Sequence, residues 1–157
     1  MGIYFMSSTK FVILPMYGRG GKVFPKSGLN QWNANGSKRS RKFNEIYVNV
    51  PSIVHKKFPH FFPHQDAHFD LVFPDGRAVM ASLCQSGGKA LMTKPNSELG
   101  KLILRDILDV DEGEIVTNST LKEKGVDSVK IESTSGFSYK LSFPQFGAYE
   151  EFLRAIN

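Results

Sequence analysis

Residues 69–84 read FDLVFPDGRAVMASLC and contain the strongest fold signal in the chain. The runs 69–73 and 78–84 are rich in Phe, Val, Leu and Ala, and they flank the turn sequence PDGR at 74–77. Asp-Gly between two such runs is typical of a tight turn that joins two antiparallel strands. The stretch therefore predicts a β-hairpin.

Further strand patterns lie on both sides of this hairpin. Residues 10–17 (KFVILPMY) are a continuous β-branched and aromatic run, and residues 45–50 (EIYVNV) alternate apolar and polar side chains. Residues 126–132 and 137–143 predict a second hairpin, and residues 115–116 predict a short strand. Successive strands follow one another too closely for βαβ units, which favours antiparallel pairing.

The helical patterns are short by comparison. A Pro-Ser pair starts a predicted helix at 52–58, and apolar residues share one helical face at 97–108. A helical turn is expected at 120–124, and an amphipathic helix at 146–156 ends the chain. We therefore expect a mainly β fold with short helices, an open β-barrel of about seven strands.

Length and composition predict one soluble domain. The chain has 157 residues, of which 41% are hydrophobic and 22% are charged. We expect residues 1–9 to be a boundary segment, 10–143 the domain and 144–157 a C-terminal helix. The apolar residues 3–6 are too few to span a membrane, so no membrane partner is expected. The single cysteine, Cys84, excludes a disulfide within the chain and fits a cytoplasmic location.

Charge is distributed unevenly along the sequence. Residues 1–60 hold ten Lys or Arg against one acid, whereas residues 61–157 hold ten Lys or Arg against fourteen acids. A basic half beside an acidic half gives a polarised field that attracts a polyanion. The alternative is a solvated basic face without a partner.

Fragments of enzyme motifs fail on spacing. GGK at 20–22 and 87–89 lacks the earlier glycine and the following Ser or Thr of a phosphate-binding loop. Histidines recur every four residues from 60 to 68, but prolines interrupt the helix that would align them on a metal. HKK at 55–57 lacks the aspartate that completes a phospholipase-D-type nuclease motif. We therefore expect no catalytic residue, no metal site and no cofactor.

Two long polar connectors remain, at 18–43 and 85–96. Both contain Lys or Arg and neither contains an acid. Lys and Arg neutralise phosphates, Arg also binds the guanine edge with two hydrogen bonds, and Asn or Gln binds adenine in the same way. This composition favours nucleic-acid binding over a disordered polar loop.

Four segments carry a resemblance to a known family. They are LPMYG…GKVFPKSGLNQWNA from residue 14, NEIYVNVPSIVHKKFPHFFP from residue 44, FPDGRAVMASLCQSGGKALMTKPNSELGKLILRD from residue 73 and EGEIVT…GVDSVKI from residue 112. Over residues 11–143 the chain resembles the C-terminal DNA-binding domain of BfiI- and NgoAVII-type restriction endonucleases. That domain is a plant B-three-like DNA-binding pseudobarrel.

The resemblance implies a barrel that grips double-stranded DNA in the major groove with two arms. It also implies the role of recognition domain of a type II enzyme in a bacterial restriction-modification system. In this chain the first arm would be residues 27–41 and the second arm residues 85–96. The full-length relatives carry a separate phospholipase-D-type nuclease domain, whose motif is missing here. The chain is therefore expected to bind a short specific site without cutting it.

The resemblance does not fix which arm residues contact bases, so side-chain chemistry supplies our assignment. Base contacts are expected from Asn33, Asn35, Arg39, Arg41, Gln85, Ser86 and Lys89. Phosphate contacts are expected from Arg19, Lys22, Lys26, Lys38, Thr93, Lys94 and Asn96. Trp32 is expected to anchor the first arm on the barrel, with stacking against DNA as the alternative.

Three other functions stay open from the sequence alone. A small metal-dependent nuclease would use Asp66, Asp70 and the histidines. A single-stranded RNA binder would need several stacking aromatics, where the connectors offer one Trp and few other rings. A protein-interaction module would use the Phe-rich corner at residues 58–62, whose rings are more typical of a core.

Overall fold

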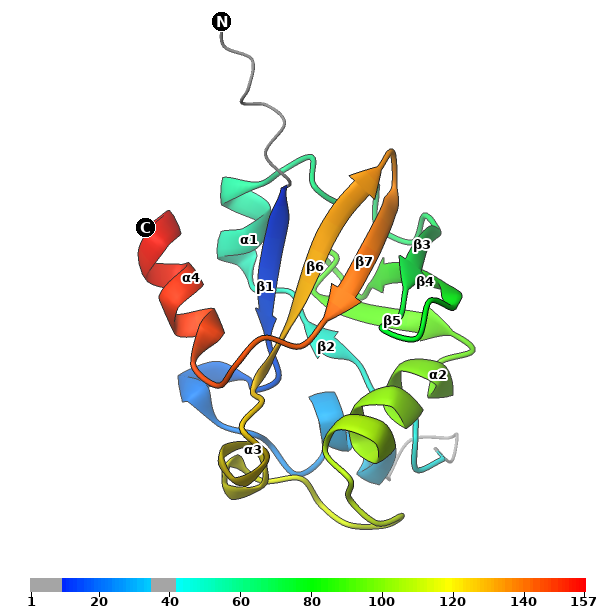
Figure 1. Ribbon diagram of the computed structural model, residues 1–157, viewed down its shortest axis with the longest axis vertical. Coiled ribbons are helices and arrows are strands. Elements are labelled where there is room, and N and C mark those ends of the chain that lie inside the picture. Colours follow the sequence, from blue (N-terminus) through cyan, green and yellow to red (C-terminus); the bar gives the residue numbers. More distant parts are fainter. Residues whose placement is uncertain (1–9, 35–41) are drawn as a thin grey trace, which may run out of the picture.

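The computed structural model describes residues 10–34 and 42–157, which are organised around one sheet (Figure 1). Its strands run in the order β1-β6-β7-β3-β4-β5-β2. Neighbouring strands are antiparallel except β3 and β7, which are parallel. The strands are β1 (Phe11–Pro15), β2 (Val48–Asn49), β3 (Phe69–Val72), β4 (Ala78–Cys84), β5 (Ala90–Lys94), β6 (Ser128–Ser135) and β7 (Ser138–Ser142). The predicted mainly β fold is confirmed.

Short helices surround this sheet at the places where they were predicted. They are α1 (Ser52–Lys57), α2 (Ser97–Gly100), which continues into the π-helical segment η4 (Lys101–Ile107), α3 (Asn118–Lys124) and α4 (Ala148–Ile156). Two 3-10 turns, η2 (Arg19–Gly21) and η3 (Gly28–Asn33), lie in the first connector. Helices α1 and α4 lie beside β1, whereas α2 and α3 lie lower in the view (Figure 1). No helix of the described residues is long and apolar enough to cross a membrane.

The predicted hairpin of residues 69–84 is present as β3 and β4. Its turn closes with hydrogen bonds from Gly76 N to the Phe73 carbonyl and from Phe73 N to the Arg77 carbonyl. Gly76 has a φ of 93°, a conformation that glycine adopts without a Cβ clash. The Asp-Gly pair therefore forms the turn for which its chemistry is suited.

Alternate side chains of the strands build the core. Leu71 in β3 is fully buried, while its neighbour Asp70 is exposed. Tyr139 of β7 lies at the centre, where its ring packs against Phe61, Phe62 and Phe69. Its hydroxyl donates to the Phe61 carbonyl, so the one polar atom of this ring is satisfied.

The expectation of a polar connector over the whole of 85–96 is wrong in its middle. Residues Ala90–Lys94 form β5, which pairs with β4. Leu91 and Thr93 face the interior of the fold and are buried. The polar hydroxyl of Thr93 is hydrogen-bonded inside the fold, which composition alone did not indicate. Residues 85–89 and 95–96 lie outside the strands, and residues 85–89 are called the second turn below.

Two other predicted strands are shorter or missing. β2 covers only Val48–Asn49 of the predicted 45–50, although Ile46, Val48 and Val50 are all buried as the alternation predicts. Residues 115–116 form no strand. The backbone of Val116 instead bonds to a buried side chain from the first connector.

Candidate nucleic-acid interface

The base of the first connector is fixed by α3. Asn118 Nδ2 donates to the Gly21 carbonyl at 2.8 Å, and Asn118 Oδ1 accepts from Val23 N at 3.0 Å. Arg19 and Lys22 lie on this same short segment, and both are exposed. Exposed cations on a fixed backbone are suited to phosphates, which position a protein on nucleic acid.

Asn30 holds the middle of the first connector and does not face solvent. It is fully buried, and its Nδ2 donates to the carbonyls of Phe24 and Val116 at 2.9 Å each. Its Oδ1 accepts from Val116 N at 2.9 Å. Gln31 is also buried. These two amides therefore shape the connector and are unavailable to bases, although the sequence presents them beside the amides assigned to base contact.

Trp32 packs the middle of the first connector against its last residue, Phe43. Its ring packs edge-on against Phe43, with 4.9 Å between the ring centroids. The Arg105 guanidinium lies 5.9 Å from the centroid of the same Phe43 ring. Trp32 also packs against the buried core. This position is suited to an anchor, because it joins the connector to the barrel through apolar area.

The remaining residues assigned to the first arm divide into two groups. Lys26 is exposed, and Asn33 is half-buried with its Nδ2 donating to the Pro25 carbonyl at 2.9 Å. Four assigned residues lie outside the described residues: Asn35, Lys38, Arg39 and Arg41.

The second turn is held by two neighbouring elements. His55 Nε2 of α1 donates to the Gly88 carbonyl at 3.0 Å. Val50 N, which follows β2, donates to the Lys89 carbonyl at 2.9 Å. Gly88 is buried with a φ of 65°, where a larger residue would be strained. The turn is therefore rigid at its base and presents three exposed side chains, Gln85, Ser86 and Lys89.

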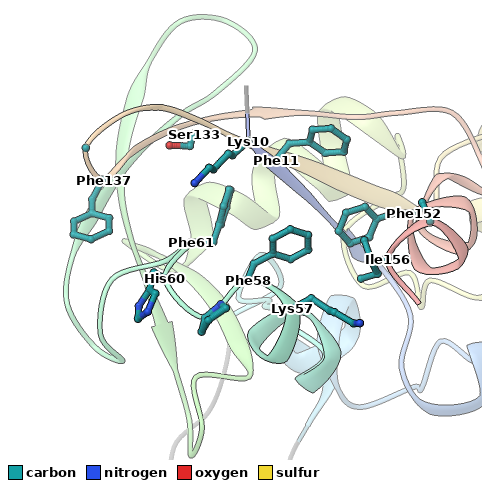
Figure 2. A pocket seen from close by; sticks show the side chains of 13 residues that line it. Lys10, Phe11, Lys57, Phe58, His60, Phe61, Ser133, Phe137, Phe152 and Ile156 are labelled. Atoms are coloured by element: carbon teal, nitrogen blue, oxygen red, sulfur yellow. The ribbon is translucent and has the colours of Figure 1, made fainter. Parts of the chain in front are cut away.

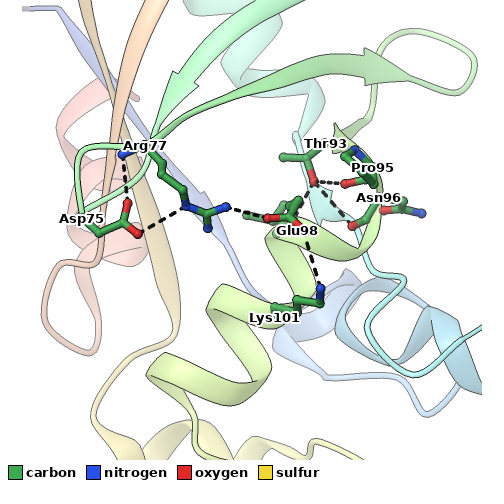
Figure 3. A network of polar contacts seen from close by, with 8 residues as sticks. Asp75, Arg77, Thr93, Pro95, Asn96, Glu98 and Lys101 are labelled. Carbon is green, nitrogen blue, oxygen red and sulfur yellow. Dashed lines mark hydrogen bonds and ion pairs between the residues drawn. The ribbon is translucent and has the colours of Figure 1, made fainter.

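The other residues assigned to the second arm lie at the far end of β5, roughly 16 Å of extended strand from the second turn. Figure 3 shows Thr93 there, beside Pro95 and Asn96. Thr93 is 5% exposed, and its hydroxyl donates to the Pro95 carbonyl at 2.9 Å and accepts from Leu99 N at 3.1 Å. This geometry contradicts a phosphate contact by Thr93, because its hydroxyl organises the start of α2. Lys94 is exposed and Asn96 half-buried at this distant end.

A network of charged side chains lies at the same end of the sheet, near the end of β5 (Figure 3). Arg77 donates to Glu98 at 2.7 Å and to Asp75 at 3.3 Å, and Lys101 Nζ lies 3.7 Å from Glu98. The hydrogen bond from Arg77 holds the pKa of the Glu98 carboxyl below its usual range. Because these cations face carboxylates, this end is less suited to DNA phosphates than the end with the second turn.

A hollow of about 800 Å³ lies between the two connectors. Arg19 from the first and Lys89 from the second both line it. The fold therefore brings together two cations from different connectors. Asn49 and Ser52 line the hollow too. No sequence pattern pointed to these two residues, because they reach the hollow only through the tertiary fold.

Tyr17 forms part of the wall of this hollow. Burial raises the pKa of its phenol to about 12, and the nearby carboxylates of Asp127 and Glu150 add to the rise. The phenol is therefore neutral at physiological pH.

A second hollow, of about 720 Å³, is lined by aromatic rings (Figure 2). Phe58 and Phe152 lie side by side in it, with ring centroids 6.0 Å apart, and Phe137 lies at its other end. None of the assigned DNA contacts lines it. Within the Phe-rich corner, Phe61 and Phe62 are buried in the core as expected.

The described residues contain no group of three or more His, Cys, Asp or Glu side chains that could hold a metal ion. His60, His64 and His68 are all exposed on an irregular segment. Asp66 and Asp70, the carboxylates of the nuclease alternative, are exposed as well. The described geometry thus offers the metal-dependent nuclease no ligand set.

Residues 4–135 match the NgoFVII C-terminal B3-like DNA-binding domain, which confirms the resemblance identified in the sequence. A solved structure of a hypothetical Arabidopsis thaliana protein is 11% identical, covers 89% of this chain and 94% of that chain, and has a TM-score of 0.42. The search of curated proteins found no match. Since the family match spans well over half of the sequence, this chain belongs to the B3-like DNA-binding domains of NgoFVII-type restriction endonucleases.

Proposed function

We propose that this DNA-binding domain recognises a short specific site in double-stranded DNA, with both arms in the major groove. The observation that supports the proposal most is the shared hollow. Arg19 and Lys89 come from connectors far apart in sequence, yet they line one surface. Two such arms position a duplex through phosphates and leave the arm tips to read base edges.

The residue roles follow from position and chemistry. We assign the phosphate contacts to Arg19, Lys22, Lys26 and Lys38. Base contacts fall to Asn33, Asn35, Arg39, Arg41, Gln85, Ser86 and Lys89. Asn33 would exchange its bond to the Pro25 carbonyl for a base, and Trp32 would anchor the first arm. Thr93 is omitted because it is buried, and Lys94 and Asn96 because they lie at the distant end of β5.

We further propose that the domain is not catalytic by itself and serves a type II restriction endonuclease in the bacterial cytoplasm. Among the described residues, no group of three or more His, Cys, Asp or Glu side chains could hold a metal ion, and the sequence lacks a complete nuclease motif. The cleavage step would come from a separate nuclease domain of the full-length protein. As a control, the pure chain is incubated with plasmid and Mg²⁺, and plasmid cleavage is measured. Cleavage that disappears in Asp70→Ala would contradict this part of the proposal.

Selection from a pool of random duplexes tests the recognition proposal. The immobilised chain is incubated with the pool at moderate salt, and bound duplexes are amplified and sequenced over several rounds. We expect convergence on one short motif, because each wrong base pair costs about 1–3 kcal/mol in specific complexes. The same selection with an Arg39→Ala, Arg41→Ala double variant should relax the motif. A pool that stays random with the unmodified chain contradicts sequence-specific recognition.

A further inference from the structure

Helix α4 supplies another wall of the hollow between the two connectors. Tyr149, Glu150 and Leu153 line the same hollow as Arg19 and Lys89. This helix lies beyond residue 135, where the family match ends. Glu150 is the one acidic side chain among the described residues that line the hollow.

The position of α4 is fixed at its start and in its middle. At the start, Asp127 Oδ1 accepts from Gly147 N at 3.0 Å, which links the start of the helix to the residue before β6. Further along, Phe152 packs against Phe11 of β1 and Phe58 after α1, with centroids 6.1 and 6.0 Å apart. The contacts of Gly147 and Phe152 therefore hold this helix beside the hollow. Glu150 takes no part in these contacts, so replacing it should not move the helix.

The charge of Glu150 acts inside the hollow. It contributes to the raised pKa of Tyr17, whose side chain is in the wall. Asp127 contributes to the same rise, but it is buried and one of its oxygens is bonded to Gly147. Glu150 is exposed and lines the hollow, so its side chain is accessible to a molecule that enters.

We infer that α4 is part of the DNA-facing surface and that Glu150 opposes the DNA phosphates, which lowers the affinity of the domain for duplexes of every sequence. The inference rests on the proposed function. A duplex carries one negative charge for about every 1.7 Å of its axis. A backbone seated between Arg19 and Lys89 would therefore place phosphates within the screening length of Glu150, about 8 Å at physiological salt.

The repulsion acts on both binding modes. Nonspecific binding depends on charge alone, whereas the specific complex also has base contacts. Because both complexes carry the same repulsion, Glu150 lowers both affinities by a similar factor and leaves their ratio unchanged. At a protein concentration that saturates the specific site, the lower affinity therefore reduces nonspecific occupancy while the specific site stays occupied.

The test compares Glu150→Gln with Glu151→Gln. Glu151 is the next residue of α4, is also an exposed glutamate, and does not line the hollow. Affinities for the selected duplex and a scrambled duplex are measured by fluorescence anisotropy at several salt concentrations.

We expect Glu150→Gln to bind both duplexes several-fold more tightly, on the order of fivefold for one like-charge contact removed. Glu151→Gln should match the unmodified chain. Glu150→Lys should bind tighter still, with the salt slope steeper by about one.

Each other outcome has a distinct meaning. Equal gains from the two glutamine variants would show an effect of net charge alone and overturn the assignment to the hollow. Loss of affinity in Glu150→Gln that is confined to one base pair of the site would make Glu150 a base-reading residue, which also overturns the inference. If the unmodified chain binds no duplex, the proposed function fails. If it binds and Glu150→Gln changes nothing, only the inference about α4 fails.

Discussion

Asn30 and Asn33 show how one side-chain type takes different roles within a single connector. Asn30 is buried and makes three hydrogen bonds to backbone groups of Phe24 and Val116. Asn33, half-buried nearby, makes one to Pro25. The first builds the connector, and the second retains contact with solvent. Only the second type of position can read a base.

Replacing Asn30 should therefore affect stability before it affects binding. Asn30→Ala leaves the buried N–H and carbonyl of Val116 and the part-buried carbonyl of Phe24 without their partner, which should lower the free energy of unfolding by about 2–3 kcal/mol. Asn33→Ala is the matched control and should cost less than about 1 kcal/mol. Urea unfolding of both variants measures the difference. Equal effects would mean that burial of Asn30 does not determine its role.

Lys89 and Thr93 lie at opposite ends of β5 and make opposite predictions. Lys89→Ala should weaken binding to the selected duplex more than to a scrambled duplex, as expected for a base contact, and the loss of one cation should also reduce the slope of log affinity against log salt by about one. Thr93→Val should leave that slope unchanged and lower the free energy of unfolding by about 1 kcal/mol, because Leu99 N loses its acceptor. Anisotropy titrations across salt concentrations and urea unfolding separate the two. A reduced slope in Thr93→Val would return Thr93 to the phosphate set.

Two tyrosines predict how stability changes in alkali. Burial raises the pKa of both Tyr17 and Tyr139 to about 12, from the ordinary value of 10.0. The folded protein therefore retains these protons to higher pH than the unfolded chain. Their contribution to stability is complete below pH 10 and is lost as pH rises through 12. Denaturant unfolding from below pH 10 to pH 12 should show this decline, and Tyr139→Phe should flatten it in part. A Tyr139→Phe variant that retains the whole decline would contradict the assignment.

At the scale of elements, α2 packs closely against the residue that follows the first connector. A Cβ on Gly100 would lie 1.8 Å from the Asn44 carbonyl oxygen, and that oxygen belongs to the backbone. Asn44 follows directly after the first connector, so α2 fixes the position at which the connector returns to the barrel.

Gly100→Ala should therefore destabilise the fold, against the usual trend for a helix. Alanine in place of glycine normally stabilises a helix by up to about 1 kcal/mol. Here the clash should reverse the sign and lower the free energy of unfolding by about 3 kcal/mol, since neither backbone can move away cheaply. Ser119→Ala, at an exposed position in α3, is the control and should be close to neutral. A stabilised Gly100→Ala would show that the contact relaxes.

The elements also show what the sequence alone can predict. The hairpin of β3 and β4 was predictable because Asp-Gly allows few backbone conformations other than its turn. β5 was not, because Thr93 is polar by composition but buried through hydrogen bonds that only the folded chain supplies. The cations of both connectors were visible as a pattern of charge. The hollow that unites Arg19 with Lys89 was not, since its walls come from segments that meet only in three dimensions.

At the scale of the whole molecule, the two hollows differ in chemistry. One lies between the connectors and is lined by Arg19, Lys89 and Glu150, whereas the other is lined by phenylalanine rings together with Lys10 and Lys57. Only the first hollow has cations from both connectors, so it is the face on which we propose that a duplex binds. Sequence-specific recognition requires that the domain bind one duplex more tightly than another on that face.

The most direct test is the affinity of the unmodified chain for its selected duplex and for a scrambled duplex of equal length at the same salt concentration. We predict that the selected duplex binds at least about a thousandfold more tightly, the lower end of the range for specific DNA-binding domains. Both affinities should fall as salt increases, because both complexes share the phosphate contacts. Equal affinity for the two duplexes at moderate salt would contradict sequence-specific recognition by this domain.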